Sequence, residues 1–417
     1  MILALFLACN GGKDTAADTT PPPEDSPLLA ALSMERVKAH VDLLAGDDFA
    51  GRTPGSQGHA DARDYLLGEM ADIGLEPIGD SYSHAFPLTL DDTRYTLDSS
   101  GQAVPIEATE GVNLVGVLPG SDPALADEYI VLMAHYDHLG ADPGGEIYNG
   151  AFDDITGVAA LLELAEAMQA SEVALPRSIL FILTDAEEGG LNGSAAWLTN
   201  TGIDLDDIVF GLSVDPLGRG VLPDYWPLVL LGVERSPGLK ARWQVLADDA
   251  DVDVIFVNRS PIPIFGSDQD SFYALEEPIS ALWFVSPGMT WYHTTDDAPE
   301  TIDYRTVRDH LRFLAGAIAE LASDDQRYTD AGPQDLTAED AQQAIKLLQG
   351  AQGSAELSDS ERGDAQDLID ALTPAADGDA DALSSLNGPY LQAALFILFD
   401  LPVAHPGQVP PPWPAGE

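Results

Sequence analysis

Five residues of metal-binding type stand at the ends of predicted strands or in the loops after them. They are His135, Asp153, Glu188, Asp215 and His293. Two imidazoles and three carboxylates make a full ligand set for a pair of zinc ions that share one carboxylate. A second acid, Glu187, lies directly beside Glu188 and can carry a proton. This combination indicates hydrolysis by a metal-bound water.

The first of these ligands lies in the sequence MAHYDHLG, residues 133–140. His135 leaves the end of an apolar strand predicted over 129–134. We expect Asp137 to accept a hydrogen bond from the imidazole and so fix its tautomer, because metal-ligating histidines usually need such a partner. An ordinary polar turn after a strand is the alternative interpretation of this motif. No role is predicted for the neighbouring His138.

The second ligand lies in NGAFDDITG, residues 149–157, where a loop enters a predicted helix. A carboxylate flanked by glycines at this junction can present its two oxygens to two cations. Helix capping by Asp153 or Asp154 is the alternative, and taken alone it is the more common use of an acid at such a junction. The motif indicates a shared metal ligand only in combination with the others.

Adjacent acids follow another predicted strand, in TDAEEGGLNGS, residues 184–194. Two carboxylates directly after a buried strand are costly unless they are used, so one can bind metal while the other carries a proton. An acidic surface turn is the alternative. Asp215 precedes a proline, which is commonly a turn, and His293 lies in a loop beside Tyr292, which offers a phenolic donor. These last two signals are weak alone.

Near-continuous apolar runs predict strands over 129–134, 178–184, 208–214 and 279–285. Such runs are typical of strands buried on both faces, as in a mostly parallel sheet. Amphipathic helices between them, notably over 155–169, predict a three-layer α/β/α domain with a mostly parallel, mixed central sheet. In such sheets function gathers beyond the carboxyl ends of the strands, which is where His135, Glu188 and Asp215 fall.

Three regions are predicted along the 417-residue chain. Residues 28–323 form the catalytic α/β domain, and residues 324–417 form an acidic extension with helices over 336–348, 359–372 and 380–398. Residues 1–27 begin with a short apolar run that ends at Cys9 and continue as a Pro-rich tether. This pattern is typical of a bacterial lipoprotein signal. It predicts an extracytoplasmic protein that is anchored through Cys9 and faces the periplasm or the cell exterior; a stray apolar N-terminus is the alternative.

The composition limits the classes of partner. The chain carries 18 basic and 70 acidic residues, for a net charge of −52. Such a surface repels a phosphate backbone, which argues against a nucleic-acid partner. No segment after the N-terminal run reaches the ~20 apolar residues needed to span a bilayer. Any membrane contact is therefore expected only through a lipid at Cys9.

Taken together and in order, these motifs resemble those of the di-zinc aminopeptidases, metallopeptidase family 28. The resemblance covers roughly residues 28–321 and includes the His-x-Asp, Asp-x-x-Ser/Thr-Gly, Glu-Glu, Asp and Tyr-His motifs. It implies a fold of the zinc-exopeptidase type. It also implies the ligand assignment, in which His135 and Asp215 hold one zinc, Glu188 and His293 hold the other, and Asp153 bridges them.

The same resemblance implies that Glu187 is the general base and that Tyr292 helps to stabilise the oxyanion. The predicted function is removal of N-terminal residues from peptides with a free N-terminus, with two Zn²⁺ ions as cofactors and cobalt or manganese as alternative metals. Two positions depart from the family. Gln269 completes a Ser-Asp-Gln sequence where Ser-Asp-His is common, and Thr156 replaces the more usual serine.

Other functions stay open. Glutaminyl cyclases resemble this family but use one zinc, so a cyclase or another amide hydrolase or transferase on the same scaffold is the first alternative. A catalytically silent, receptor-like binding module is the second, although none of the five ligands is missing. A serine hydrolase is the third, but the chain lacks a Gly-x-Ser-x-Gly elbow. It also lacks His-Glu-x-x-His, the commonest pattern of one-zinc peptidases.

Overall fold

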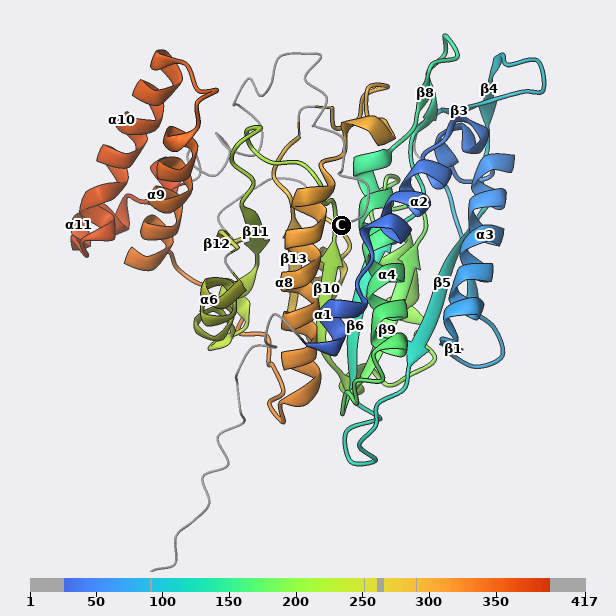
Figure 1. Cartoon of the computed structure of the whole chain (residues 1–417), viewed down its shortest axis with the longest axis horizontal. Coiled ribbons are helices and arrows are strands. Elements are labelled where there is room, and N and C mark those ends of the chain that lie inside the picture. Colours follow the sequence, from blue (N-terminus) through green and yellow to red (C-terminus); the bar gives the residue numbers. More distant parts are fainter. Residues whose placement is uncertain (1–25, 91, 251, 261–265, 290, 391–417) are drawn as a thin grey trace, which may run out of the picture.

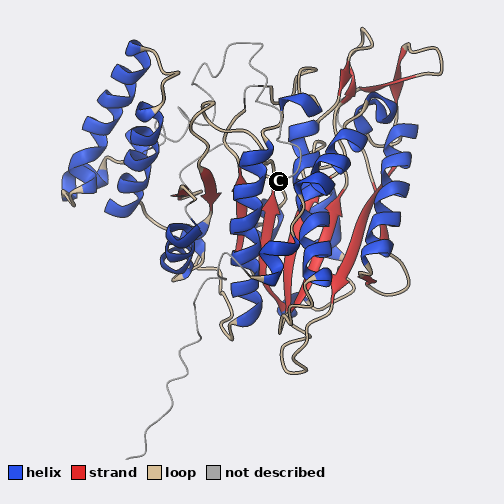
Figure 2. Ribbon diagram, viewed as in Figure 1, coloured by secondary structure: helices blue, strands red, loops and turns tan. Residues whose placement is uncertain are grey.

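The computed structural model describes residues 26–90, 92–250, 252–260, 266–289 and 291–390. Within these residues a central sheet has helices packed on both of its faces, and Figures 1 and 2 show the strands running behind the helices α4 and α8. The predicted three-layer α/β fold with a mixed sheet is confirmed, and so is the helical C-terminal region. The predicted lipoprotein signal around Cys9 and its tether lie outside the described residues.

Nine strands form the central sheet in the described part of the chain. They are β1 (Glu76–Pro77), β2 (Ser83–Pro87), β5 (Glu110–Leu118), β6 (Tyr129–His135), β9 (Ser178–Thr184), β10 (Ile208–Val214), β11 (Leu228–Leu231), β12 (Val254–Val257) and β13 (Ala281–Val285). The order is β1–β5–β9–β6–β10–β13–β11–β12, with β2 also paired to β5. Strands β9, β6, β10 and β13 run parallel, whereas β5 and β11 are antiparallel to β9 and β13. The sheet is therefore mixed, with a parallel centre.

The helices of the described residues surround this sheet. The α-helices are α1 (Pro27–Ala31), α2 (Met34–Leu44), α3 (Gln57–Ile73), α4 (Thr156–Ala170), α5 (Asn192–Thr199), α6 (Leu239–Ala250), α7 (Gln269–Tyr273), α8 (Tyr304–Ser323), α9 (Ala338–Gly353), α10 (Asp359–Ala376) and α11 (Ala380–Ser384). Short helical turns are η1 (Asp47–Arg52), η2 (Ala151–Ile155), η3 (Leu205–Asp207), η4 (Val233–Arg235) and η5 (Pro299–Thr301). Among the described helices, none combines the length and apolarity that a membrane span requires.

A smaller four-stranded sheet lies beside η1 in the order β4–β3–β7–β8. Its strands are β3 (Arg94–Leu97), β4 (Ala103–Ile106), β7 (Gly140–Ala141) and β8 (Ile147–Tyr148). Strands β7 and β8 pair antiparallel and connect the end of β6 to η2. This hairpin thus fixes the path of the chain between two of the predicted ligands, His135 and Asp153.

The strands of the central sheet bury their two faces in different cores. In β6, Ile130 and Leu132 belong to the core that includes residues of α1, α2, α3, α4 and α8, whereas Val131 and Met133 belong to the core that includes residues of α5 and α7. Side chains alternate across a strand, so an unbroken apolar run is what a strand covered on both faces requires. This requirement explains why the apolar runs located the central strands.

The C-terminal helices share one face of the sheet. Helices α9 and α10 pack against each other, and α9 packs against β12, in a core that includes Ile255, Trp283, Leu348 and Leu372. The helices predicted over 336–348 and 359–372 are observed over 338–353 and 359–376. The third, predicted over 380–398, begins as predicted, but α11 ends at Ser384, and residues 391–398 lie outside the described residues.

Candidate metal centre

The five predicted ligands meet at the carboxyl edge of the central sheet. His135 is the last residue of β6, and Asp215 directly follows the parallel neighbour β10. Glu188 follows β9, the other parallel neighbour of β6. Asp153 arrives on η2, and His293 lies in the loop after β13. Because parallel strands end at one edge of a sheet, residues far apart in the sequence come within contact distance there.

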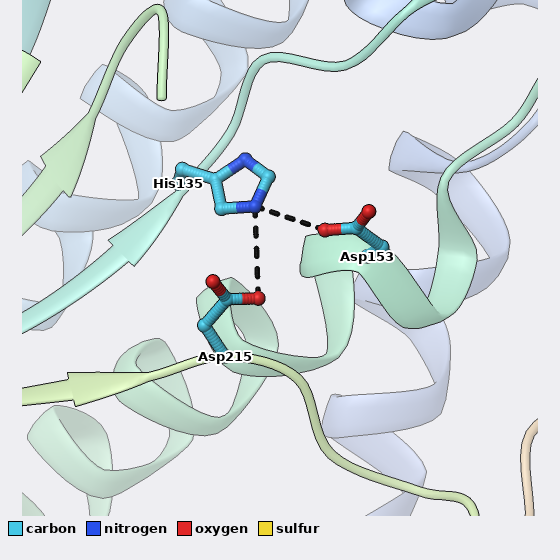
Figure 3. Close-up of side chains that lie close together, drawn as sticks. All are labelled: His135, Asp153 and Asp215. Carbon is cyan, nitrogen blue, oxygen red and sulfur yellow. Dashed lines mark hydrogen bonds and ion pairs between the residues drawn. The ribbon is translucent and has the colours of Figure 1, made fainter. Parts of the chain in front are cut away.

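The first cluster is formed by His135, Asp153 and Asp215. The Nε2 atom of His135 lies 3.0 Å from Oδ1 of Asp153 and 3.7 Å from Oδ1 of Asp215. Figure 3 shows the imidazole at the strand end with the same nitrogen facing both carboxylates. All three side chains are buried, and their ligand atoms lie close enough together to hold one metal ion.

The second cluster is formed around Glu188. The Nε2 atom of His293 lies 3.0 Å from Oε2 of Glu188 and 3.1 Å from Oδ2 of Asp153. The Nδ1 atom of His138 lies 2.7 Å from Oε1 of Glu188. The side chains of His138, Asp153 and Glu188 form a second group that could hold a metal ion. Asp153 therefore offers one oxygen to each cluster, as a shared ligand would.

The donor set of these clusters fits metal ions. Nε2 of His138 is buried and has no hydrogen-bond partner among the described residues, whereas the buried atoms Nδ1 of His138, Oδ2 of Asp153 and Oε1 of Glu188 face groups of the clusters themselves. Buried polar atoms without partners are rare in folded proteins. A cation held by the two carboxylates would satisfy their oxygens, and imidazole with carboxylate is a ligand combination that zinc accepts.

In the absence of a metal ion, protons on the imidazoles balance the carboxylates. Burial lowers the pKa of His135, but Asp215 and hydrogen bonds to carboxylates outweigh it and hold that pKa well above the usual value. Burial also lowers the pKa of His293, but hydrogen bonds to Asp153 and Glu188 outweigh this effect and raise the pKa to about 10. Burial and the charge of Asp153 raise the pKa of Glu188, yet its imidazole partners bring it down to about 2. A metal ion must displace imidazole protons to bind.

Asp137 holds the turn that carries the two adjacent glutamates. Its carboxylate accepts hydrogen bonds from the backbone N–H groups of Glu187 at 3.0 Å and of Glu188 at 3.4 Å. The sequence predicted that this carboxylate accepts from His135. Instead, the hydrogen-bond contact of His135 Nδ1 is with the backbone carbonyl of Asp137 at 3.1 Å, and the carboxylate lies 3.6 Å away. Asp137 therefore orients the imidazole with its main chain and the glutamate turn with its side chain.

Burial shifts the pKa values of Glu187 and Tyr292, the two side chains with predicted roles in proton transfer and oxyanion binding. Burial raises the pKa of Glu187 well above its usual value; His135 opposes this shift, and the charges of Asp215 and Glu188 reinforce it. Burial raises the pKa of Tyr292 as well, so its phenol stays a hydrogen-bond donor at neutral pH. The Tyr292 ring stacks on His293 with ring centroids 3.8 Å apart. The catalytic roles of Glu187 and Tyr292 stay predictions.

The two residues that depart from the family pattern are both buried and make polar contacts. The hydroxyl of Thr156 donates to the carbonyl of Phe152 at 2.8 Å and accepts from the backbone N–H of Leu217 at 3.0 Å. It thus ties η2 to the segment after Asp215, a bond that serine could equally make. Gln269 is fully buried, and its amide donates to Asp270 at 3.0 Å.

One buried arginine, which sequence reasoning did not single out, ties two loops of the centre together. The guanidinium of Arg52 is fully buried and donates to the backbone carbonyls of Tyr136, Asn149 and Gly150. The first carbonyl lies directly after His135, and the other two lie in the loop that enters η2. Arg52 therefore joins the segment that carries His135 to the segment that carries Asp153.

A second buried arginine acts through a carboxylate. Arg219 forms an ion pair of 2.7 Å with Asp297, and its guanidinium lies over the ring of Phe152, 4.4 Å from the centroid. The Asp297 carboxylate also accepts from the backbone N–H groups of Phe152 at 2.8 Å and Asp153 at 3.1 Å. This pair anchors the backbone of the shared ligand to the loop that bears His293.

The fold and the clusters together define an α/β protein whose described residues could hold metal ions, as a centre for hydrolysis requires. Residues 113–318 match the family model described as peptidase family M28. Over these residues the chain is similar to peptidase family M28.

Sequence relatives match parts of longer proteins. Leupeptin-inactivating enzyme 1 of Streptomyces exfoliatus is 31% identical over 189 residues, which are 45% of this chain and 35% of that relative. A second curated relative is 28% identical over 166 residues, which are 39% of this chain and 19% of that relative. The chain thus spans well under half the length of these curated relatives.

Solved structures share the fold at low identity. A zinc aminopeptidase from Bacillus subtilis, BSAP, has a TM-score of 0.55 and 12% identity, and the match covers 73% of this chain and 99% of that chain. A glutaminyl cyclase from Bacteroides thetaiotaomicron has a TM-score of 0.52 and 17% identity, and that match covers 74% of this chain and 100% of that chain. Likeness at these identities establishes the fold of the described chain.

Proposed function

We propose that this protein is a metal-dependent aminopeptidase that uses two zinc ions to remove N-terminal residues from peptides. The observation that carries the proposal is the position of Asp153. One of its oxygens lies 3.0 Å from His135, and the other lies 3.1 Å from His293. A carboxylate placed between two imidazole–carboxylate clusters is the arrangement that a two-metal hydrolase requires. The match of residues 113–318 to the model of peptidase family M28 supports peptides as the substrate.

The proposed ligands follow the two clusters. His135 and Asp215 hold one ion, Glu188 and His293 hold the other, and Asp153 bridges both. When bound, the metal pair lowers the pKa of the attacking water and polarises the amide carbonyl. The side chain of His293 is 36% exposed, so the second cluster borders solvent, and a substrate can approach from this side.

Glu187 takes the proton from the attacking water and later delivers it to the nitrogen of the leaving amine. Asp137 keeps the Glu187 turn in place through the 3.0 Å bond to its backbone N–H. The phenol of Tyr292 donates a hydrogen bond to the carbonyl oxygen as negative charge develops there. The carboxylates around the second cluster attract the cationic α-amino group, which favours cleavage at a free N-terminus.

Replacement of Glu187 by glutamine tests this assignment. The variant Glu187→Gln should keep its bound metal, because Glu187 is not a proposed ligand, and should lose at least ~10²-fold in kcat. The matched control is Glu277→Gln, at an exposed position, which should retain the activity. Metal content is measured by elemental analysis, and activity with a panel of aminoacyl anilides. Retained activity in Glu187→Gln would remove the assigned base.

The N-terminal specificity has its own control. Each anilide is compared with its N-acetylated counterpart, which lacks the cationic amine. An aminopeptidase should hydrolyse only the free-amine form. Equal rates for the two forms would contradict the exopeptidase proposal, although the metal centre could still stand.

A glutaminyl-cyclase-like transferase is the second candidate, because a cyclase shares the fold over 74% of this chain. Such an enzyme needs one zinc and converts an N-terminal glutamine to a pyroglutamyl ring with release of ammonia. Two metal ions per chain together with release of free amino acids favour the aminopeptidase. One metal ion per chain together with ammonia release from a glutaminyl peptide would favour the cyclase.

A further inference from the structure

His138 is the residue of the centre whose position the five-ligand scheme leaves unexplained. Its side chain is fully buried, and its Nε2 atom has no hydrogen-bond partner among the described residues. Burial of an imidazole is costly unless its nitrogens gain partners. One such partner is a proposed metal ligand, because Nδ1 lies 2.7 Å from Oε1 of Glu188, and the same position would let Nδ1 share a metal ion with that carboxylate.

The backbone holds this ring in place. The N–H of His138 donates to the carbonyl of Arg52 at 3.4 Å. A Cβ atom added at Gly150 would lie 2.5 Å from Cδ2 of the His138 ring, closer than side chains pack. Gly150 has a φ of 58°, a conformation that glycine adopts without strain. The glycine thus makes the space into which the imidazole fits.

The ring is directed at the second cluster. Its Nδ1 atom lies 2.7 Å from Oε1 of Glu188 and 3.9 Å from Oδ2 of Asp153. The corresponding distances from Nε2 of His293 are 3.0 Å to Glu188 and 3.1 Å to Asp153. Ligand atoms of a tetrahedral zinc site lie about 3.4 Å apart, because each bond is about 2.1 Å long. The four observed distances bracket that spacing.

We propose that His138 is a sixth ligand of the metal pair and binds the second ion through Nδ1. This inference rests on the metal centre of the proposed function and deepens it. The second ion then has four protein ligands, His138, His293, Glu188 and Asp153. The first ion keeps three, His135, Asp215 and Asp153.

This difference makes the two sites unequal. Zinc sites with four protein ligands are typical of structural positions, whereas sites with three ligands keep an open position for chemistry. The second site therefore retains its ion more tightly, and the open coordination position belongs to the site of His135. The first equivalent of metal added to the metal-free protein fills the cluster of His138.

Cadmium-113 binding to protein with nitrogen-15-labelled histidine tests the ligand directly, because only a coordinated ring nitrogen shows scalar coupling to the metal. The chain has eight histidines. With two equivalents of cadmium, we expect coupling at His135, His293 and Nδ1 of His138. Coupling at His135 and His293 alone would overturn the sixth ligand and leave the metal centre of the proposed function standing. Coupling at none of the three would contradict the metal centre itself.

The variant His138→Asn tests whether His138 binds the metal ion itself or only orients another ligand. Its amide nitrogen stands near the place of Nδ1 and can hydrogen-bond Glu188, but an amide is not among the usual zinc ligands. Loss of an orienting partner lowers metal affinity about 10–100-fold. Loss of a ligand should therefore lower the affinity of the tighter site more than ~100-fold. A smaller change in the zinc dissociation constant, measured by chelator competition, would overturn the proposal.

His84→Asn is the matched control, because His84 is partly buried and lies in β2 rather than in the clusters. It should leave both zinc dissociation constants unchanged. Circular dichroism of the metal-free variants checks that they fold. The cadmium measurement uses the unsubstituted protein, so it decides the question even if His138→Asn does not fold.

Discussion

Replacement of Asp297 by asparagine should destabilise the metal-free protein by about 3–5 kcal/mol, the usual cost of removing one partner from a buried ion pair. Asp297 and Arg219 are both buried, and their ion pair of 2.7 Å lies away from solvent. Burial lowers the pKa of Arg219 while Asp297 opposes the shift, so the cation depends on this carboxylate. Asparagine keeps the shape of the side chain and removes the charge.

The same substitution should loosen the shared ligand. The Asp297 carboxylate accepts the backbone N–H groups of Phe152 and Asp153, and the asparagine amide group can replace at most one of these two acceptors. Removal of a group that orients a metal ligand costs about 10–100-fold in metal affinity. We therefore expect the zinc dissociation constants of Asp297→Asn to rise within that range.

The assay is chemical unfolding of chelator-treated protein at neutral pH, followed by far-UV circular dichroism. The matched control is Asp309→Asn, because Asp309 forms an ion pair of 2.8 Å with Arg308 on the surface, and exposed pairs contribute about 0–1 kcal/mol. The double variant with Arg219→Met should be less destabilised than the sum of its two single variants, since neither charge is then left alone. A loss in Asp297→Asn no larger than that of Asp309→Asn would refute the reasoning.

Three further outcomes are expected. Because burial lowers the pKa of His310 to about 4 from 6.5, the unfolded state binds more protons between these two pH values. As the pH decreases from 6.5 towards 4, the free energy of unfolding should therefore fall, by about 2 kcal/mol at about pH 5. His310→Gln should lack this loss when the two metal-free proteins are compared by chemical unfolding. Zinc added back at about 100 times its dissociation constant should raise the free energy of unfolding by about 2.7 kcal/mol per site, measured by the same method. Leu348→Ala, in the core between α9 and the sheet, should cost about 2–5 kcal/mol in a single unfolding transition; a separate early transition would contradict a shared core.

The sequence predicted the parts of the site that depend on strand ends. His135 and Asp215 could be placed because each follows an apolar run, and parallel strands bring such positions together. His138 could not be placed in this way. It lies in a turn whose direction depends on Gly150 and on the hairpin β7–β8, and neither has a periodic pattern. The sequence pattern that could have indicated His138 as a ligand is the second histidine in the motif of His135.

The buried ion pair was missed for a similar reason. Arg219 and Asp297 are separated by 78 positions, and although Asp297 lies in the motif of His293, Arg219 belongs to no motif. A side chain that interacts with loop backbone leaves no spacing rule in the sequence, because the loops are positioned by the rest of the fold. The packing of α9 on β12 could not be predicted either. The sequence of an amphipathic helix indicates an apolar face but not which surface covers that face.

The charges around the centre explain why the positive side chain that ties its two loops together, Arg52, is an arginine bonded to backbone. Histidine protons balance the carboxylates only until a metal ion displaces them. Burial lowers the pKa of Arg52 to about 10, with Asp297, Asp137 and Asp153 opposing the shift, so the guanidinium stays charged at neutral pH. Its hydrogen bonds go to carbonyls, so it competes for no carboxylate that the metal ions need. A lysine could supply the charge but not three bonds in a fixed fork, and the loops that carry His135 and Asp153 would then be joined less rigidly.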